Sequence, residues 1–194
     1  MSVNLAKGQQ ISLAKSAGGP LRLVRMGLGW KSAAPKGFLA RLTTRAVDLD
    51  ASAVLFCGAQ PADVVYFQHL TSDDGSVHHS GDDLTGGAGD GAENEWITVD
   101  LKRVPAHIDR IVFAATSFGG QTFDEVESAF CRLVDESTNR ELARYTLSGG
   151  GRHTAQIMAK VERTNAEWSM TAIGEPAHGR SFQELMPAMS SHIR

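Results

Sequence analysis

The chain contains 194 residues, 42% of them hydrophobic, and carries a formal net charge of -3 with a pI near 6.1. This length and composition are those of a single domain with one core. The near-balanced charge excludes a molecule-wide field that would draw the protein to nucleic acid or to an anionic membrane, so any charge that matters must be local.

Short strands separated by turns are predicted along the first half of the chain. Apolar and polar residues alternate in several of these runs, and clusters rich in glycine, proline or serine separate them. In the run that starts at Val47, a period of two places Asp48 and Asp50 on one face, and Val47 and Leu49 on the other. The predicted strands cover residues 11–15, 21–30, 47–57, 63–69, 95–101 and 108–116.

A short helix is predicted near Thr122. Residues 122–125 have the spacing of a capping box, and Phe123, Val126 and Phe130 recur at helical intervals. Strands are then predicted at residues 131–135, 141–147, 155–163 and 167–173, of which the last two form a hairpin. This succession predicts a mainly β fold, a two-sheet β-sandwich with one or two short helices.

The tail repeats the capping-box spacing from Ser181 to Glu184, ahead of the apolar residues Leu185 and Met189. Pro187 would interrupt a long helix, so a short or kinked amphipathic segment is expected, docked on the sandwich or on a partner. We therefore divide the chain into a sandwich domain, residues 1–174, and a short C-terminal docking segment, residues 175–194.

The two cysteines, Cys57 and Cys131, lie in apolar runs without the CxxC spacing of a zinc or redox site, and we expect both to be reduced. The first residues lack the apolar centre of a signal peptide, and no segment approaches the ~20 apolar residues that span a bilayer. The expected location is the cytoplasm, with no transmembrane segment.

The segment from Asp73 to Glu95 holds seven carboxylates, no lysine or arginine, and many glycines. Crowded carboxylates repel one another unless they are well solvated or a hard cation lies among them. Glycines let the backbone turn and present carbonyl oxygens, the neutral ligands that calcium takes beside carboxylates. A calcium-binding loop and a solvated acidic hairpin both fit this composition.

Asp48 and Asp50 favour the calcium interpretation. They project from one face of a strand whose other face is apolar, so they would join a shared cation site if the acidic loop folds across them. An EF-hand is excluded, because with Asp82 at loop position 1 the apolar Leu84 occupies position 3, and strands rather than helices flank the loop. Magnesium, which prefers octahedral geometry and retained waters, fits this ligand-rich loop less well.

Zinc or iron would need histidine or cysteine ligands. His78 and His79 are adjacent in a predicted strand and point to opposite faces, so each is expected to be a partly exposed strand histidine rather than a ligand. GxSxG, HExxH and phosphate-binding loop motifs are absent, and the sequence shows no acid or nucleophile partner for His69, His107 or His153. We therefore predict that the protein is not an enzyme.

These motifs resemble those of the TerD family, the tellurium-resistance and general stress-response proteins of bacteria. The resemblance covers nearly the whole chain. It is carried by Val3 to Gln9, by Gly27-Leu28-Gly29-Trp30, by Asp48-Leu49-Asp50-Ala51-Ser52 and, most specifically, by Asp74 to Gly86 followed by Gly89-Asp90-Gly91 and Glu93-Asn94-Glu95.

The resemblance implies calcium-binding acidic loops at one edge of a β-sandwich. Lys31 follows Trp30 where the family usually has aspartate, and Asp83 stands where it commonly has asparagine. The change at Lys31 argues against a second calcium ion, so one intact site is expected. Carried over position by position, the metal ligands would be Asp48, Asp50, Asp82, Asp83, Asp90, Glu93 and Glu95.

The resemblance also implies a non-enzymatic role in resistance to tellurite and other stresses. The expected partners are calcium and the proteins of a stress-response complex, in the cytoplasm or at the inner face of the membrane, with no nucleic acid. The alternative is a calcium-dependent lipid or membrane adaptor with no role in tellurium chemistry. A hydrolase or metal-reducing enzyme is the third class, and it would depend on Cys57 and Cys131.

Overall fold

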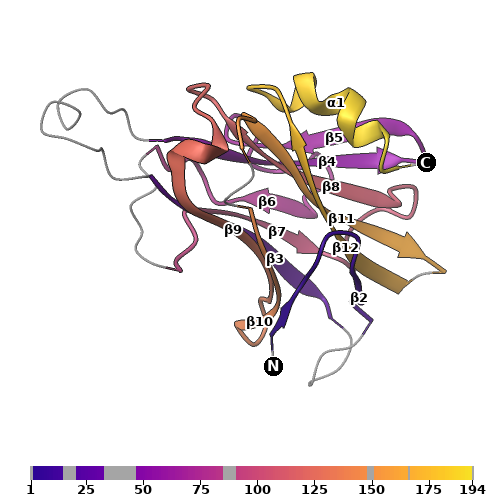
Figure 1. Cartoon of the computed structure of the whole chain (residues 1–194). Coiled ribbons are helices and arrows are strands. Elements are labelled where there is room, and N and C mark those ends of the chain that lie inside the picture. The colour runs from indigo at the N-terminus through magenta and orange to yellow at the C-terminus, as the bar shows by residue number, and fades with distance from the viewer. Residues whose placement is uncertain are drawn as a thin grey trace, which may run out of the picture.

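The computed structural model describes residues 2–14, 21–32, 47–84, 91–147, 151–165 and 167–193. Within them, two six-stranded sheets pack face to face, which confirms the predicted β-sandwich (Figure 1). The first sheet has the order β1-β10-β9-β3-β7-β6 and the second the order β2-β12-β11-β8-β4-β5. β1 pairs in parallel with β10, and the other described pairs are antiparallel.

The strand positions follow the predicted runs, with ends that differ by a few residues. The first sheet contains β1 (Val3–Asn4), β3 (Leu23–Ser32), β6 (Val77–His79), β7 (Glu95–Asp100), β9 (Val126–Asp135) and β10 (Arg140–Thr146). The second sheet contains β2 (Gln10–Ser12), β4 (Leu49–Cys57), β5 (Gln60–Val65), β8 (Arg110–Ser117), β11 (Ala155–Thr164) and β12 (Glu167–Ala177).

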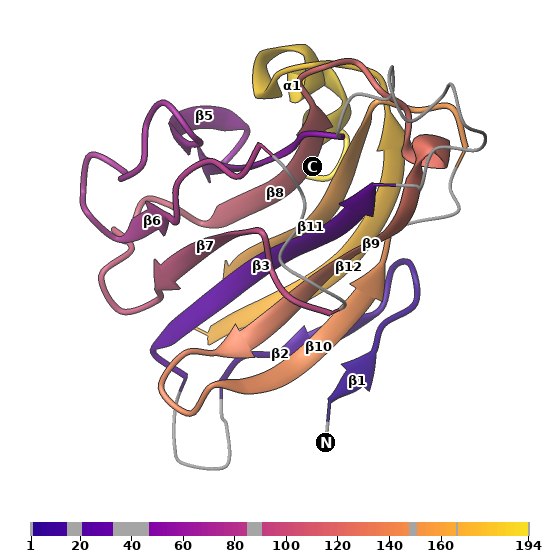
Figure 2. The same cartoon turned by 90° about the vertical axis from the view of Figure 1, so that its left-hand side faces the viewer.

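Two separate cores flank the second sheet. The main core lies between the sheets, where alternate residues of each strand point inward, as Ile97 and Val99 do on β7. The smaller core lies on the outer face of the second sheet, beneath helix α1 (Phe182–Ser190), whose Leu185 and Met189 are buried there (Figures 1 and 2). β4 is therefore buried on both faces, and its burial does not alternate.

The helix predicted near Thr122 needs correction, whereas the short amphipathic segment expected around Pro187 is present as α1. The helix near Thr122 is the single 3-10 turn η2 (Phe123–Glu125), and β9 begins directly after it at Val126 rather than near Cys131. Pairing with β3 from Val126 onward accounts for the difference, since a strand partner overrides a local helical spacing. Pro187 lies inside α1 without ending it, because in a nine-residue helix it removes only one internal hydrogen bond.

The start of β4 has a strand partner on one side only. β8 pairs with β4 from Leu49 to Phe56, whereas β5 pairs with β4 only from Ala53 onward, where Val65 lies opposite. Residues 49–52 therefore present an edge that no described strand covers. An uncovered edge leaves backbone N–H and C=O groups to be satisfied by other means.

Candidate metal centre

Three of the predicted ligands meet at this uncovered edge. Asp48 directly precedes β4, Asp50 is its second residue, and Asp82 comes from the loop between β6 and β7. One carboxylate oxygen from each lies within 4.8 Å of the others. Asp48 and Asp50 reach the same place because they lie two residues apart on one strand face, as the sequence predicts, while Val47 and Leu49 enter the core.

Asp50 is the buried member of this cluster, with 6% of its surface exposed. Burial, which has the largest effect, and the neighbouring carboxylates of Asp48, Glu95 and Asp82 together raise the pKa of Asp50 to about 8, and a hydrogen bond from the Phe118 backbone N–H lowers it in part. Its Oδ2 atom is buried without a hydrogen-bond partner among the residues that the structure describes. An acidic oxygen in that position is costly for the protein alone, and a bound cation would compensate it.

Glu95 connects the two sheets beside the cluster. Its carboxylate is fully buried and accepts hydrogen bonds from the backbone N–H groups of Ala51 (2.7 Å) and Asp83 (3.1 Å). Ala51 lies on the uncovered edge of β4, so a side chain of the first sheet takes the place of the missing strand of the second. Glu95 thereby fixes the positions of both segments that carry the three aspartates.

His79 complements Glu95 on the same edge. Gly81 N–H donates to its Nδ1 (3.0 Å), so the ring proton lies on Nε2, which is 3.2 Å from the carbonyl oxygen of Ala51 and 3.5 Å from Glu95 Oε2. The expectation of a partly exposed strand histidine is correct for the exposed His78 and wrong for His79, which is 7% exposed. His79 is buried because its ring contacts the Ala51 carbonyl, on the part of β4 that β5 does not cover.

Asp83 and Glu93, two of the other predicted ligands, have partners of their own and are not part of the group formed by the three aspartates. Asp83 accepts a hydrogen bond from Asn94 Nδ2 (3.2 Å). The carboxylate of Glu93 lies 2.7 Å from Arg132 Nε and 3.4 Å from Arg25 Nε, over the surface of the first sheet. Lys31, expected to weaken a second ion site, lies 3.4 Å from Glu127 in an exposed ion pair on neighbouring strands. Asp90 lies outside the described residues.

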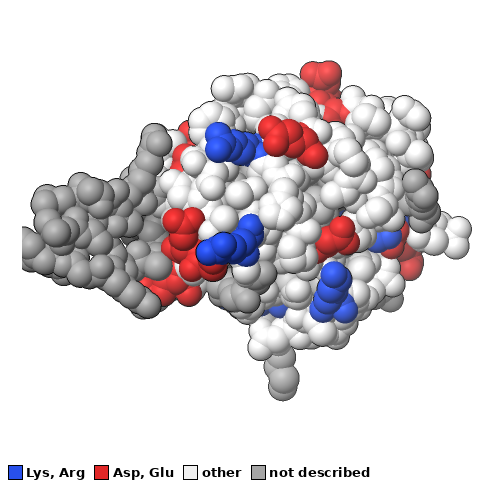
Figure 3. Space-filling view, turned by 45° about the horizontal axis from the view of Figure 1, so that its top comes forward, with Lys and Arg blue, Asp and Glu red and all other residues white. Residues whose placement is uncertain are grey.

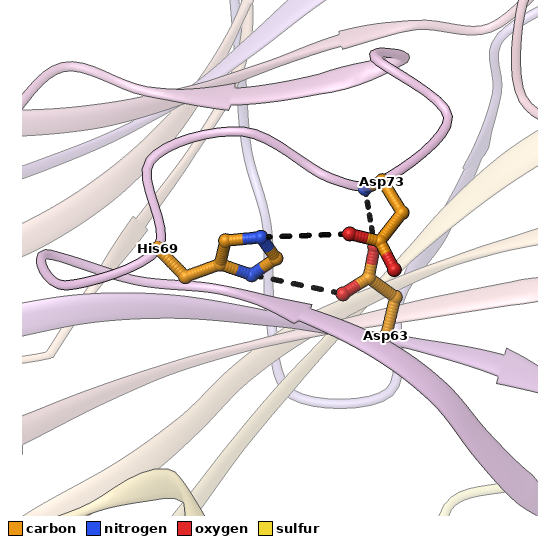
Figure 4. Close-up of side chains that lie close together, drawn as sticks. All are labelled: Asp63, His69 and Asp73. Carbon is orange, nitrogen blue, oxygen red and sulfur yellow. Dashed lines mark hydrogen bonds and ion pairs between the residues drawn. The ribbon is translucent and has the colours of Figure 1, made fainter.

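The structure contains a second group of residues that could hold a metal ion, which the sequence did not predict. The imidazole of His69 faces the carboxylates of Asp63 and Asp73, with nitrogen–oxygen distances of 3.7 and 3.8 Å (Figure 4). The four-residue spacing of His69 and Asp73 is the only signal of it in the sequence. Both oxygens of Asp63 accept backbone hydrogen bonds, from Val64 and Asp73, so this group is satisfied without an ion.

The chemistry of the Asp48–Asp50–Asp82 cluster is that of a hard-cation site. It offers only carboxylate oxygens, and calcium takes 6–8 oxygen ligands, which can include backbone carbonyls and water. The unpartnered Oδ2 of Asp50 fits a bound cation and separates this cluster from the one at His69. Asp48, Asp50 and Asp82 are therefore a group that could hold a metal ion, and their oxygen donors are of the kind that calcium takes, with Glu95 beside them to hold the two segments in place.

The face of the molecule at the top of Figure 1 does not carry charges of a single sign. On the face at the top of Figure 1, acidic and basic side chains are interspersed among uncharged residues, with several acidic groups gathered at one edge (Figure 3). Among the described residues, no helix combines the length and hydropathy needed to cross a membrane.

Comparison with known proteins gives the relatives of the chain. Residues 1–188 match the TerD domain. The chain is 41% identical to tellurium resistance protein TerZ of Serratia marcescens over 94% of each chain, and 39% identical to general stress protein 16U of Bacillus subtilis over 92% of this chain and 93% of that protein. A solved homologue of the telluride resistance protein TerD from Streptomyces coelicolor shares the fold, with a TM-score of 0.69 and 21% identity over 88% of this chain and 98% of that one. The chain therefore belongs to the TerD family.

Proposed function

We propose that this protein binds one calcium ion at Asp48, Asp50 and Asp82 and acts, without catalysis, in tellurite resistance and the response to stress. The observation that carries the calcium site is the buried, unpartnered Oδ2 of Asp50 beside two other carboxylates. Two relatives are named as a tellurium resistance protein and a general stress protein, and these names support the cellular role.

Calcium would join two segments that are distant in sequence. The segment that leads into and begins β4 supplies Asp48 and Asp50, and the β6–β7 loop supplies Asp82. Without the ion, the repulsion among the three carboxylates acts against the Glu95 hydrogen bonds that hold these segments together. The bound ion removes that repulsion, so it should order the loop and fix the surface that the protein presents to its partners.

Calcium is expected to raise the thermal midpoint of the chelator-stripped protein. A ligand that binds only the folded state stabilises it by RT ln(1 + [L]/Kd), about 2.7 kcal/mol at 100 times Kd. Asp82→Asn should remove most of this gain and change the metal-free midpoint little, because Asp82 is exposed. Calorimetry should give one ion per chain for the unchanged protein.

Asp73→Asn is the matched control, since it removes an exposed carboxylate from the other cluster. It should leave the calcium response unchanged. A calcium response lost in Asp73→Asn and kept in Asp82→Asn would place the ion at His69 and refute the proposed site. In a bacterial host sensitised by deletion of its own TerD-family gene, the unchanged protein should restore growth on tellurite, and Asp82→Asn should not.

A further inference from the structure

A pocket of about 210 Å³ opens beside the candidate metal centre. It forms where β5 leaves β4, because the chain turns away after Val65 and residues 66–68 no longer pair with the start of β4. The end of β8 and the beginning of α1 close the remaining sides. The pocket shares Asp50 with the metal centre, so a ligand in it would lie next to the bound ion.

The floor of this pocket is polar and has unused hydrogen-bonding capacity. Asp50, Ser52 and Thr116 line it, and each is at least nine-tenths buried. Within the described parts of the chain, Asp50 Oδ2 and Ser52 Oγ have no hydrogen-bond partner. Buried polar atoms without partners are uncommon, and those that line a pocket mark the place where a ligand or ion completes them.

The walls are aromatic. Tyr66 lies 5.1 Å from Phe182 and 5.5 Å from Phe67, and Phe67 lies 6.1 Å from Phe118, measured between ring centroids. All four residues line the pocket, although they come from three separate segments of the chain. Phe118 is 59% exposed, an unusual state for a large apolar side chain in the part of the chain that the structure describes. A ring or short apolar group would pack among these side chains.

The end of the pocket formed by α1 carries the guanidinium of Arg180. Arg180 and Ser181 precede the helix and line the pocket, and the Ser181 side chain does not cap the helix. The Glu184 carboxylate in the first turn of α1 accepts a hydrogen bond from the Arg180 backbone N–H (3.2 Å) and offsets part of the positive end of the helix dipole. The Arg180 guanidinium lies against Gly120, where a Cβ would approach its Nη2 to 2.8 Å, and makes no ion pair with the described residues.

These features describe a ligand with a doubly charged oxyanion and a ring. Without the ion, an anion in the pocket would lie beside the acidic cluster of Asp48, Asp50 and Asp82, whereas a cation bound there and the guanidinium of Arg180 would attract the anion from both sides. An inorganic anion alone would leave the aromatic walls unused. We propose that the pocket binds a phosphate monoester, with its phosphate between the metal centre and Arg180 and its organic group against Tyr66, Phe67, Phe118 and Phe182, an inference that rests on the proposed calcium site.

Phenyl phosphate is the probe that tests this proposal, with inorganic phosphate for comparison. Calorimetric titration of the full chain should show phenyl phosphate binding in calcium, with at least about tenfold weaker binding in chelator and for inorganic phosphate in calcium. Arg180→Gln should weaken both ligands about tenfold, and Phe118→Ala should weaken phenyl phosphate selectively. Arg140→Gln, an exposed change on β10 of the other sheet, is the matched control and should alter neither.

Calcium affinity measured without the ester separates this proposal from the one on which it depends. If the unchanged protein binds calcium but not phenyl phosphate, or binds it equally in chelator, the pocket assignment is wrong and the metal centre stands. If calcium itself does not bind, the proposed calcium site is wrong, and the pocket proposal that rests on it is wrong as well. Flotation with phosphatidylcholine vesicles that contain phosphatidic acid identifies the source: calcium-dependent flotation lost in Arg180→Gln supports a lipid headgroup, and binding of phenyl phosphate without flotation supports a soluble ester.

Discussion

Asp50→Asn is expected to stabilise the metal-free protein and to abolish its stabilisation by calcium. The asparagine keeps an oxygen for the Phe118 N–H and removes the carboxylate that burial and three neighbouring acids disfavour. Most substitutions of a buried polar residue destabilise a protein. A gain in stability at Asp50 would therefore indicate a site whose carboxylates are stabilised by a bound ion.

The size and pH dependence of this effect follow from the pKa of Asp50, which is about 8 in the folded protein. Between the ordinary value of about 4 and the folded value, the folded state binds a proton that the unfolded state releases. The metal-free protein should therefore lose stability as the pH rises from about 4 to about 8, by at most about 4 kcal/mol at pH 7. Asp50→Asn should recover up to this amount and flatten the pH profile over the same range.

Denaturant unfolding at several pH values, in chelator and in excess calcium, measures both parts of this prediction. Asp82→Asn is the control from the same cluster: it should lose the calcium response with a smaller gain in the metal-free state, because Asp82 is exposed. A metal-free Asp50→Asn variant less stable than the unchanged protein at pH 7 would show that the Asp50 carboxylate is satisfied without an ion, and the metal centre would lose its main support.

Glu95→Ala is expected to lower the free energy of unfolding by about 2–4 kcal/mol in calcium, because two buried backbone N–H groups lose their acceptor. The same change releases the β6–β7 loop that carries Asp82, so calcium affinity should fall about tenfold or more. Relief of the repulsion between Glu95 and Asp50 offsets part of the loss in the metal-free protein. The destabilisation should therefore be larger in calcium than in chelator.

Glu127→Ala is the matched control, since Glu127 is half exposed and pairs with Lys31 on the surface. Its effect should stay within about 0.5 kcal/mol, with calcium affinity unchanged. Glu95→Gln should fall between the two, because its amide retains one acceptor oxygen and directs an NH2 group at the other N–H. Equal destabilisation of Glu95→Ala in calcium and in chelator would assign Glu95 a structural role without a share in ion binding.

Asp50 and Glu95 show how far the sequence specifies the candidate site. A period of two is a local property, so the run from Val47 onward predicts that Asp48 and Asp50 share a face, and the structure agrees. The lack of cations in the acidic loop likewise points to Asp82 before any fold is known. The sequence treats Glu93 and Glu95 alike, however, because both are acids beside the same loop.

Glu93 and Glu95 differ only through the segments they meet. Glu93 lies against Arg25 and Arg132, which β3 and β9 bring from distant parts of the chain. Glu95 enters the space between the sheets, where β5 has left the edge of β4 uncovered. Nothing near either glutamate in the sequence distinguishes an arginine partner from a backbone one.

The sequence by itself determined the mainly β class, most of the strands and the amphipathic tail, and it predicted the three aspartates of the candidate metal centre among seven possible ligands, because alternation, turn residues and charge composition are properties of neighbouring positions. The tertiary structure alone decided where β5 stops, which buries His79 and Glu95 and opens the pocket between Asp50 and Arg180. These features depend on the lengths of paired strands and on contacts between segments distant in sequence, since 28 residues separate Ala51 from His79 and 44 separate Ala51 from Glu95. Burial and unpaired backbone arise only when such segments meet, and they set the electrostatics of the candidate site.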